Sequence, residues 1–350
     1  MRPLVLLPAH DFYREMKSEN VEWKIQTPGE RSLSGSDCPG HYQMRFGDTP
    51  HPIPYQGSKR QLASLILSFV PARRFHRMFE PFVGSGAVTL AAAKKNLCDE
   101  FIVSDKLEPL CGIWRQIVND PKRLADAYSE LWHSQLPNSP AFFNRVRSEF
   151  NEDRCPAKLL FLLARCVKNA VRFNPSGEFN QSADKRRLGT KPQTMRSEIE
   201  GASSLLHGRC EVRSGDYKTV LSAATSHDIA YMDPPYQGTS EGRDSRYFQG
   251  VGRSDLVAAL ETLNQRGVQF ILSYDGACGD KTYGEVLPET LQLKRILVDA
   301  GRSSQSTLNG KDARTVESIY LSRGLASSVR VPSVVHARFV QQQVALFEQV

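Results

Sequence analysis

The chain has 350 residues, 40% of them hydrophobic and 24% charged, with a formal net charge of +7. This composition is typical of a soluble globular protein, and no apolar run approaches the ~20 residues that a membrane helix needs. Because the amino-terminal residues also lack a signal-peptide cleavage pattern, we expect a cytoplasmic protein with no membrane partner. The seven cysteines never form a C-x-x-C pair, so neither a disulfide framework nor a metal site is predicted. The positive charge favours an anionic partner such as nucleic acid, although charge alone is a weak indication.

The first half of the chain begins like a sheet covered by helices. Residues 1–50 are rich in Ser, Gly, Pro and charge, and we expect an irregular extension there. Apolar residues at helical spacing then predict a helix that ends before Pro71. The segments "RFHRMFEP", "AVTLAAAKKN" and "EFIVSD" predict a strand, a helix ending near Asn96 and a second strand. This succession is a βαβ unit, which is typical of a parallel sheet.

Residues 110–208 change character, because helical segments replace the alternation of strands and helices. The predicted helices are "GIWRQIV", "RLADAYSELWHSQL", "AFFNRVRSEFNE" and "PAKLLFLLARCVKNAV". The alternation resumes after residue 208 with "CEVRSGDY", "DIAYMDPPY", "SDLVAALETLNQRG", "VQFILSYDG", "LQLKRILV" and "VESIYLS". We therefore expect an α/β fold of residues 51–110 and 209–325, with residues 111–208 as an inserted, mainly helical domain. In the tail, 326–350, the spacing of Val335, Phe339, Val344 and Phe347 indicates a terminal helix or a partner-binding segment, and packing against the core is the favoured role.

A glycine turn after the first strand indicates a nucleoside cofactor. Gly84-x-Gly86 lets the backbone bend sharply and lets a ligand approach where a β-carbon would collide. Asp105 follows Gly86 by nineteen residues, at the end of the next strand, where an acid can accept from both ribose hydroxyls. Thr89 replaces the third glycine of a dinucleotide motif. The glycines alone leave open NAD, S-adenosylmethionine and a purely structural turn capped by a solvated Asp.

The segment Asp233-Pro234-Pro235-Tyr236 predicts the chemistry. Two consecutive prolines end a strand, because neither can donate to a sheet ladder. The Asp233 carboxylate and the Pro234 carbonyl could accept from the two hydrogens of an exocyclic amine, which would free its delocalised lone pair. Tyr236 offers a flat face for an unstacked base. The structural alternative is a strand that ends in a Pro-Pro turn with a surface Asp.

Taken together, residues 52–323 resemble the Dam-type, D12 class N6-adenine DNA methyltransferases of the α group. "PYQGSK", "EPFVGSG", "IVSD", "RFNPSGEFN" and "DPPY" stand in the order of that family's motifs. The resemblance implies a Rossmann-like methyltransferase sheet, S-adenosyl-L-methionine as cofactor, double-stranded DNA as substrate and residues 111–208 as a target-recognition domain. It implies catalysis by residues 233–236. It also implies a cofactor pocket that includes Tyr55, Lys59, Glu80, Pro81, Phe82, Gly84, Gly86 and Asp105.

The recognition segment departs from the family pattern, so the DNA sequence that is read is not predicted. Gln181 to Asp184 replace the usual Val-Pro-Phe-Gly, and Tyr274 stands where Asn is common. Arg172 could pair with a guanine edge, and Asn174 belongs to the same segment. Phosphate contacts are expected from the basic stretch that includes Lys185, Arg186 and Arg187. Asp216 is either near the cofactor's adenine or a turn residue.

Other functions remain open at this stage. The same tetrapeptide type serves N4-cytosine, RNA and protein-glutamine methylation. The chain could also be a DNA-binding modification subunit of a larger restriction complex with little activity alone. A nicotinamide oxidoreductase is disfavoured, because the third glycine is missing. We expect a monomer, and the sequence does not predict whether a cognate nuclease exists.

Overall fold

A computed structural model describes residues 49–71, 75–136, 138–235, 251–278, 281–302, 314–328 and 334–336. All of them belong to one compact unit, Thr49–Val350. Nearly all of the expected amino-terminal extension lies outside the described residues, as do Tyr236 and the tail residues Phe339, Val344 and Phe347. No helix in the described ranges is both long enough and apolar enough to cross a bilayer.

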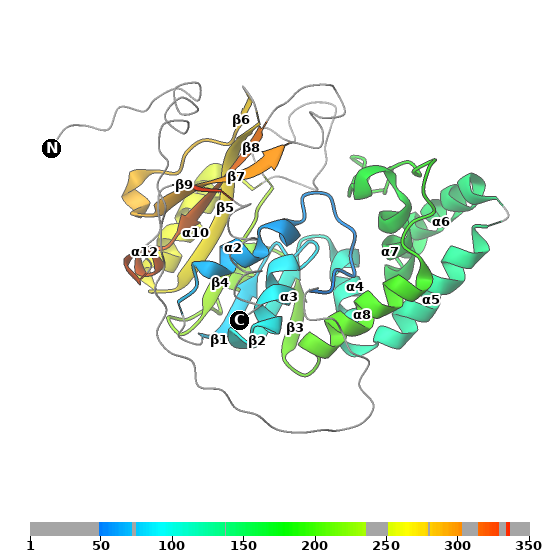
Figure 1. Ribbon diagram of the computed structural model, residues 1–350, viewed down its shortest axis with the longest axis horizontal. Coiled ribbons are helices and arrows are strands. Elements are labelled where there is room, and N and C mark those ends of the chain that lie inside the picture. The colour runs from blue at the N-terminus through cyan, green and yellow to red at the C-terminus, as the bar shows by residue number, and fades with distance from the viewer. Residues whose placement is uncertain are drawn as a thin grey trace. The chain divides into compact units, whose positions relative to one another are not determined.

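The framework is a nine-stranded mixed sheet (Figure 1). Its strands are β1 (Phe75–Glu80), β2 (Cys98–Asp105), β3 (Cys210–Ser214), β4 (Ile229–Met232), β5 (Gln269–Cys278), β6 (Lys281–Tyr283), β7 (Lys294–Arg302), β8 (Arg314–Leu321) and β9 (Val334–His336). The order is β3-β2-β1-β4-β5-β8-β7-β9, with β6 paired to β5. Strands β3 to β5 along this order are parallel, and β8 is antiparallel to both its neighbours. This arrangement confirms the α/β, Rossmann-like fold expected from the sequence.

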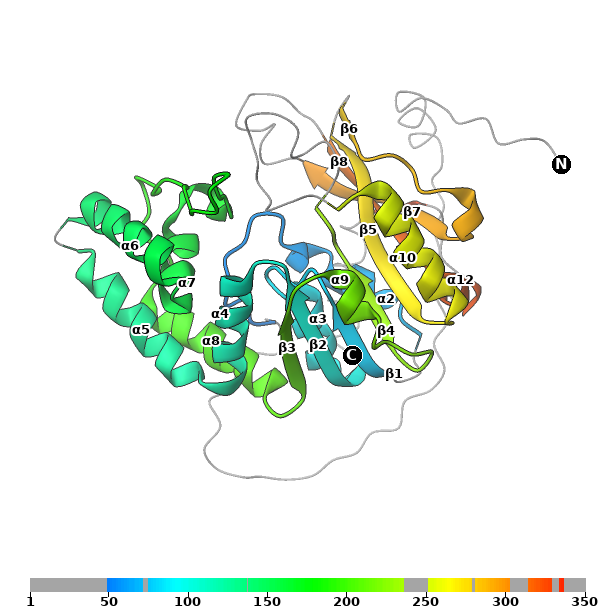
Figure 2. The ribbon, with the colours of Figure 1, turned by 180° about the vertical axis from the view of Figure 1, so that it is seen from behind.

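Helices cover both faces of the sheet. Helices α2 (Ala63–Ser68) and α3 (Ala87–Lys94) cover one face, and α9 (Tyr217–Leu221) and α10 (Arg253–Gln265) cover the other (Figures 1 and 2). Successive side chains of a strand point to opposite faces, so adjacent residues enter different cores. In β1, Met78 belongs to the core under α2 and α3, whereas Phe79 belongs to the core under α9 and α10. Both residues are buried, which is why the central strands read as continuous apolar runs.

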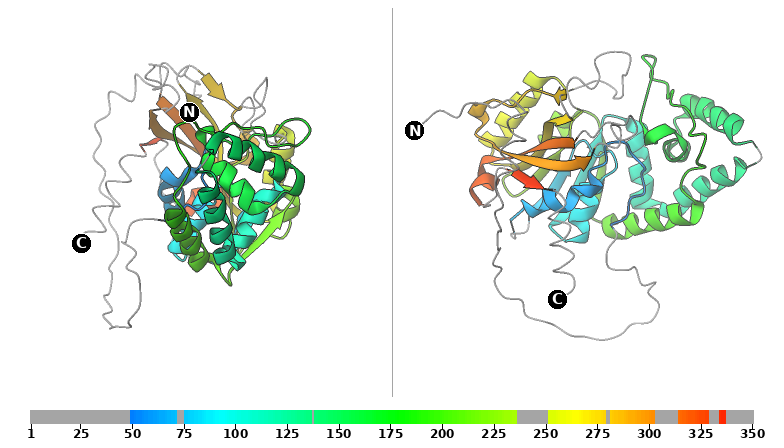
Figure 3. Two further views of the ribbon diagram at one scale, coloured as in Figure 1. Left: turned by 90° about the vertical axis from the view of Figure 1, so that its right-hand side faces the viewer. Right: turned by 45° about the horizontal axis from the view of Figure 1, so that its top comes forward.

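The predicted helical region is present beside the sheet (Figures 1 and 3). It consists of α4 (Glu108–Asn119), α5 (Pro121–Ser134), α6 (Ser139–Asp153), α7 (Pro156–Arg165) and α8 (Pro192–Leu206). Each of these helices carries a proline in its first two positions, where the missing N–H costs nothing. Helix α4 packs against α7 and α8 as well as β2 and β3. The division into a catalytic and a recognition domain stays a prediction.

Helix α8 was not predicted, although its signals are in the sequence. Its buried side chains Met195, Ile199, Ala202 and Leu206 recur at helical spacing after Pro192. The polar and basic residues just before it obscured this pattern. Short helices complete the fold: η1 (Lys59–Gln61), η2 (Val167–Asn169), η3 (Glu289–Leu291) and α12 (Arg323–Ser328).

The end of α7 and the element that contains Val335 differ from the sequence prediction. Helix α7 ends at Arg165, not at Val171, because Cys166 turns to an extended conformation and bridges to Ala183. Lys168 then adopts a left-handed conformation with φ +60°, which a continuing helix does not permit. Val335 was expected at a helical position, but it lies in β9 and pairs with Val298 of β7. Residues 334–336 of the tail thus cover the edge of β7 that does not pair with β8.

The glycine turn between β1 and α3 is fixed by aromatic packing. Gly84 and Gly86 have φ values of +45° and +61°, in the left-handed region that favours glycine. The indole N–H of Trp114 donates to the carbonyl of Gly84 at 3.1 Å. A β-carbon on Gly86 would overlap the Trp114 ring. Glycine is therefore required at this position by conformation and by space.

We predict that Gly86→Ala destabilises the fold by about 2 to 5 kcal/mol, the sum of left-handed strain and overpacking against Trp114. Gly208 is the matched control, because its φ is +76° and a β-carbon there would meet nothing within 4 Å. Gly208→Ala should cost only about 1 to 2 kcal/mol, from strain alone. Urea unfolding of both variants measures the difference. Equal losses would show that the contact with Trp114 yields without cost.

Candidate active site

The site lies where the order of the parallel strands reverses. Strand β1 is flanked by β2 on one side and by β4 on the other, so the connections leave β1 and β4 in opposite directions. Such a reversal leaves a crevice beyond the carboxyl ends of the strands. Here a cavity of about 450 Å³ opens at that edge. It is lined by the glycine turn, the residues after β4, the 55–59 segment and parts of β8, α9 and the 171–173 segment.

The wall made by the 55–59 segment and the glycine turn contains many of the predicted cofactor residues. A β-carbon on Gly84 would lie 3.4 Å from the ring of Tyr55, so this ring packs directly over the turn. The hydroxyls of Ser58 and Ser85 are 2.8 Å apart and join the two segments. Asp105 accepts from the N–H of Gly84 at 3.3 Å. Burial raises the pKa of the Asp105 carboxyl, and its backbone hydrogen bonds oppose that rise.

Glu80 lies at the end of β1 and is buried, with 3% of its surface exposed. Its carboxylate accepts from the backbone N–H of Thr89 at 2.9 Å and from the Thr89 hydroxyl. Thr89 stands at the position of the third glycine of a dinucleotide motif, and it donates two hydrogen bonds to this acid. Burial raises the pKa of Glu80 to about 8, and the nearby Asp233 contributes in the same direction.

Aromatic side chains line the part of the cavity near α9. The rings of Phe82 and Tyr217 are 5.2 Å apart at an angle of 36°. The Tyr217 hydroxyl is buried and has no hydrogen-bond partner among the described residues, and its burial raises the pKa to about 12. Asp216 caps α9 by accepting from the N–H of Lys218 at 2.8 Å. Asp216 is therefore a turn residue that also lines the cavity, and its place near the cofactor's adenine stays a prediction.

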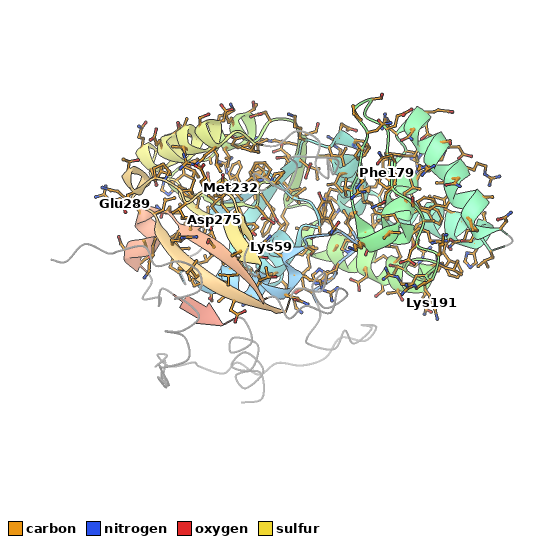
Figure 4. All side chains as sticks on the ribbon, turned by 90° about the horizontal axis from the view of Figure 1, so that it is seen from above. Lys59, Phe179, Lys191, Met232, Asp275 and Glu289 are labelled. Atoms are coloured by element: carbon orange, nitrogen blue, oxygen red, sulfur yellow. The ribbon has the colours of Figure 1, made fainter. Side chains whose placement is uncertain are left out.

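The predicted catalytic segment also lines this cavity. Asp233, Pro234 and Pro235 follow β4 and line the same cavity as Gly84 and Asp105. Lys59 Nζ lies 3.0 Å from Asp233 Oδ2, so this lysine contacts the acid expected to be catalytic. In Figure 4, Lys59 lies between the strands and the helical region marked by Phe179 and Lys191.

Sequence reasoning missed several residues of the cavity. Glu317 lies in β8 with its Oε2 atom 3.5 Å from Lys59 Nζ. The Tyr231 hydroxyl, in β4, is 3.0 Å from the Ser273 hydroxyl, and both residues are buried. Phe173 lines the cavity, and its neighbours in the sequence are the two predicted DNA-reading residues, Arg172 and Asn174. A charged residue within the apolar segment "VESIYLS" was the available signal for Glu317.

The predicted recognition segment forms a tight turn. The Asn174 side-chain oxygen accepts from the N–H of Glu178 at 2.9 Å, and its amide donates to the Glu178 carboxylate at 2.7 Å. Asn151 holds Phe179 through both backbone groups, at 2.8 and 3.1 Å. The carbonyl of Arg172 accepts from the N–H of Asn180 at 3.1 Å. Asn174 therefore has a structural role, and its contact with DNA stays a prediction.

The basic loop of residues 184–191 is anchored by a buried arginine. Arg165 is 3% exposed and donates to Gln135 at 2.7 Å and to the carbonyl of Asp184 at 2.5 Å. Gln135 in turn donates to the carbonyl of Leu188 at 3.0 Å. Arg187 forms an ion pair with Asp184 at 2.7 Å within this loop. Lys185, Arg186 and Arg187 are exposed, so a fixed backbone presents three cations to solvent.

The fold and this cavity together define a Rossmann-like methyltransferase. The chain belongs to the D12 class N6 adenine-specific DNA methyltransferase family, whose model matches residues 55–316. This match confirms the family resemblance, and the chain is accordingly an adenine-specific DNA methyltransferase.

Curated relatives that match the chain at low identity are named as methyltransferases. The type II methyltransferase M1.LlaDCHI of Lactococcus lactis subsp. cremoris is 24% identical over 281 residues, which cover 76% of this chain and 94% of the relative. The type II methyltransferase M.MjaIII of Methanocaldococcus jannaschii is 26% identical over 242 residues, 63% of this chain and 82% of that protein. The DNA N-6-adenine-methyltransferase of Escherichia phage P1 is 27% identical over 234 residues, 64% of this chain but 29% of that protein.

The pKa of Glu80 predicts a pH dependence of stability. The folded protein keeps the Glu80 proton up to about pH 8, whereas an unfolded chain releases it near 4.5. Because the unfolded state then binds fewer protons, the free energy of unfolding falls as the pH rises through this window. Glu80→Gln should remove this part of the pH dependence. Urea unfolding between pH 5 and 8.5 measures it, and parallel curves for the two proteins would contradict the raised pKa.

Proposed function

We propose that the chain transfers the methyl group of S-adenosylmethionine to N6 of an adenine that is everted from double-stranded DNA. The observation that carries this proposal is the shared cavity: the glycine turn after β1 and Asp233 after β4 line one hollow of about 450 Å³. A base held at Asp233 and a cofactor held at the glycine turn would therefore meet.

The residues of the cavity suit this cofactor. Gly84 lines the cavity, whereas Gly86 does not, since the space beside it is filled by Trp114. Asp105 also lines the cavity and can accept from a ribose diol. The Phe82 and Tyr217 rings and the buried Tyr217 hydroxyl offer an aromatic and polar surface for an adenine. Acidic side chains around the cavity favour a ligand with a sulfonium and an ammonium group: Glu80, Asp105, Asp216 and Asp233. When bound, this cofactor supplies an electrophilic methyl group.

Asp233 and Pro234 are proposed to activate the amine. The Asp233 carboxylate accepts one N6 hydrogen and the Pro234 carbonyl accepts the other, which draws the nitrogen toward tetrahedral geometry. Pro234 and Pro235 carry no N–H that could compete for these acceptors. Tyr236 is proposed to stack on the base, and it lies outside the described residues. The chain then works by positioning and electrostatics, without a covalent intermediate.

The Asp233 role is tested by substitution. We expect Asp233→Ala to lower the rate of methyl transfer by at least about 10²-fold, because an acceptor aimed at the reacting amine is lost. Cofactor and DNA affinity should persist. Transfer of labelled methyl to duplex DNA measures the rate, and mass spectrometry of the digested DNA identifies the methylated nucleoside. Turnover near the wild-type rate in Asp233→Ala would refute this role, and N4-methylcytosine as the product would refute the acceptor.

The basic loop is proposed to hold the DNA backbone. Lys185, Arg186 and Arg187 are exposed on a loop whose backbone is tied to the protein interior through Arg165 and Gln135. Contacts to phosphates fix the orientation of the duplex without reading its sequence. Arg172 is proposed to contribute on the base side. We propose a monomer that acts within a restriction-modification or phage system. One relative is a type II methyltransferase, one comes from a phage, and one is named as a modification methylase.

We predict that Lys185→Ala and Arg186→Ala each weaken DNA binding and reduce the salt slope of log K by about one. Lys95 is the matched control, because it is exposed at the end of α3, on the edge of the sheet opposite to the cavity. Binding of a duplex oligonucleotide at several salt concentrations measures the slopes. Unchanged slopes in both loop variants would exclude the loop from the DNA interface.

A further inference from the structure

Lys59 lies between two carboxylates from strands that are distant in the sequence. Its Nζ atom is 3.0 Å from Asp233 Oδ2, beyond β4, and 3.5 Å from Glu317 Oε2, in β8. The three side chains are 10%, 21% and 19% exposed, so water screens them only in part. One cation facing two anions leaves this cluster with a formal charge of −1.

The position of Glu317 is built into the sheet. Glu317 stands opposite Gly276 of β5, just beyond a bulge that shifts the register between Ser273 and Gly276. A β-carbon on Gly276 would lie 2.6 Å from the Val316 carbonyl oxygen, so a glycine lets β8 approach this closely. Asp275, in the bulge, has φ +57° and is held by an ion pair with Arg295 at 2.8 Å.

One oxygen of the Glu317 carboxylate forms no hydrogen bond with the described residues. This atom, Oε2, is buried, and it is the atom that lies 3.5 Å from Lys59. A buried carboxylate oxygen without a hydrogen bond is costly, so the attraction of the Lys59 ammonium is the compensation that the described residues offer this atom.

We propose that Glu317 is a positioning residue that shares the Lys59 ammonium with Asp233, and this inference rests on the proposed role of Asp233. Lys59 contacts one Asp233 oxygen at 3.0 Å, and the attraction of Glu317 at 3.5 Å keeps the ammonium from moving further across that carboxylate. The second oxygen of Asp233 is then the proposed acceptor for the N6 hydrogen. The residual negative charge also favours the positive charge that develops on the amine during transfer.

A double-mutant cycle tests this inference in the full-length protein. In the wild-type background, Glu317→Gln should lower kcat by about tenfold while KM for DNA and for the cofactor changes less than twofold, because the effect is on alignment of the acceptor. In the Lys59→Met background the same substitution should change the single-turnover rate less than twofold, since no ammonium remains to be shared. Glu317→Asp should recover kcat to within about threefold of wild type.

The controls separate this inference from the proposed function. Glu289→Gln is the matched substitution, because Glu289 is an exposed residue of η3, apart from Lys59 in Figure 4. It should leave kcat unchanged. Equal losses from Glu317→Gln with and without Lys59 would overturn the inference, as would a loss of less than twofold in the wild-type background. If the Lys59→Met rate is below detection, a raised KM or no recovery by Glu317→Asp would overturn it. Full turnover in Asp233→Ala would instead refute the proposed function, whatever the cycle shows.

Discussion

The reversal of strand order at β1 is the constraint on which the site depends. Because β1 pairs with β2 on one side and with β4 on the other, the loops after β1 and β4 diverge and leave a hollow beyond their carboxyl ends. The chain places a glycine turn after one strand and Asp233-Pro234-Pro235 after the other. Trp114 fixes the loop after β1 by a hydrogen bond to Gly84. The pairing of β4 with β1 and β5 sets the position of the loop after β4. The two segments therefore line one cavity because of the sheet, although they are about 150 residues apart.

The acidic side chains of the cavity differ in protonation and in pairing, because their surroundings differ. Burial raises the pKa of Glu80 to about 8, so this acid can remain protonated at neutral pH in the absence of a cationic ligand. Lys59 compensates part of the negative charge of Asp233 and Glu317. A cationic ligand at the glycine turn would favour the ionised form of the acids around it. The electrostatics of the protein thus suit a positively charged cofactor next to a neutral base.

The sequence predicted strands β1 to β5, β7 and β8 and the glycine turn because these depend on local rules. Continuous apolar runs, glycines in a turn and prolines at a strand end leave direct marks in the chain. Glu317 and Tyr231 were not predicted as cavity residues, since their place depends on which strands are neighbours. The end of α7 was wrong because a tertiary bridge from Cys166 to Ala183 overrides helix propensity. Helix α8 was missed although its apolar spacing was readable, and the Asn174 side chain proved to be bonded within its own turn.

The central claim is that Asp233 and the glycine turn serve one reaction in one cavity. The most direct measurement is a crystal structure of the chain with a non-reactive cofactor analogue and a duplex that contains the target adenine. The account predicts an everted adenine with N6 within hydrogen-bond distance, about 3 Å, of the Asp233 carboxylate and the analogue at the glycine turn. An adenine bound elsewhere, or an analogue that leaves the glycine turn empty, would contradict it.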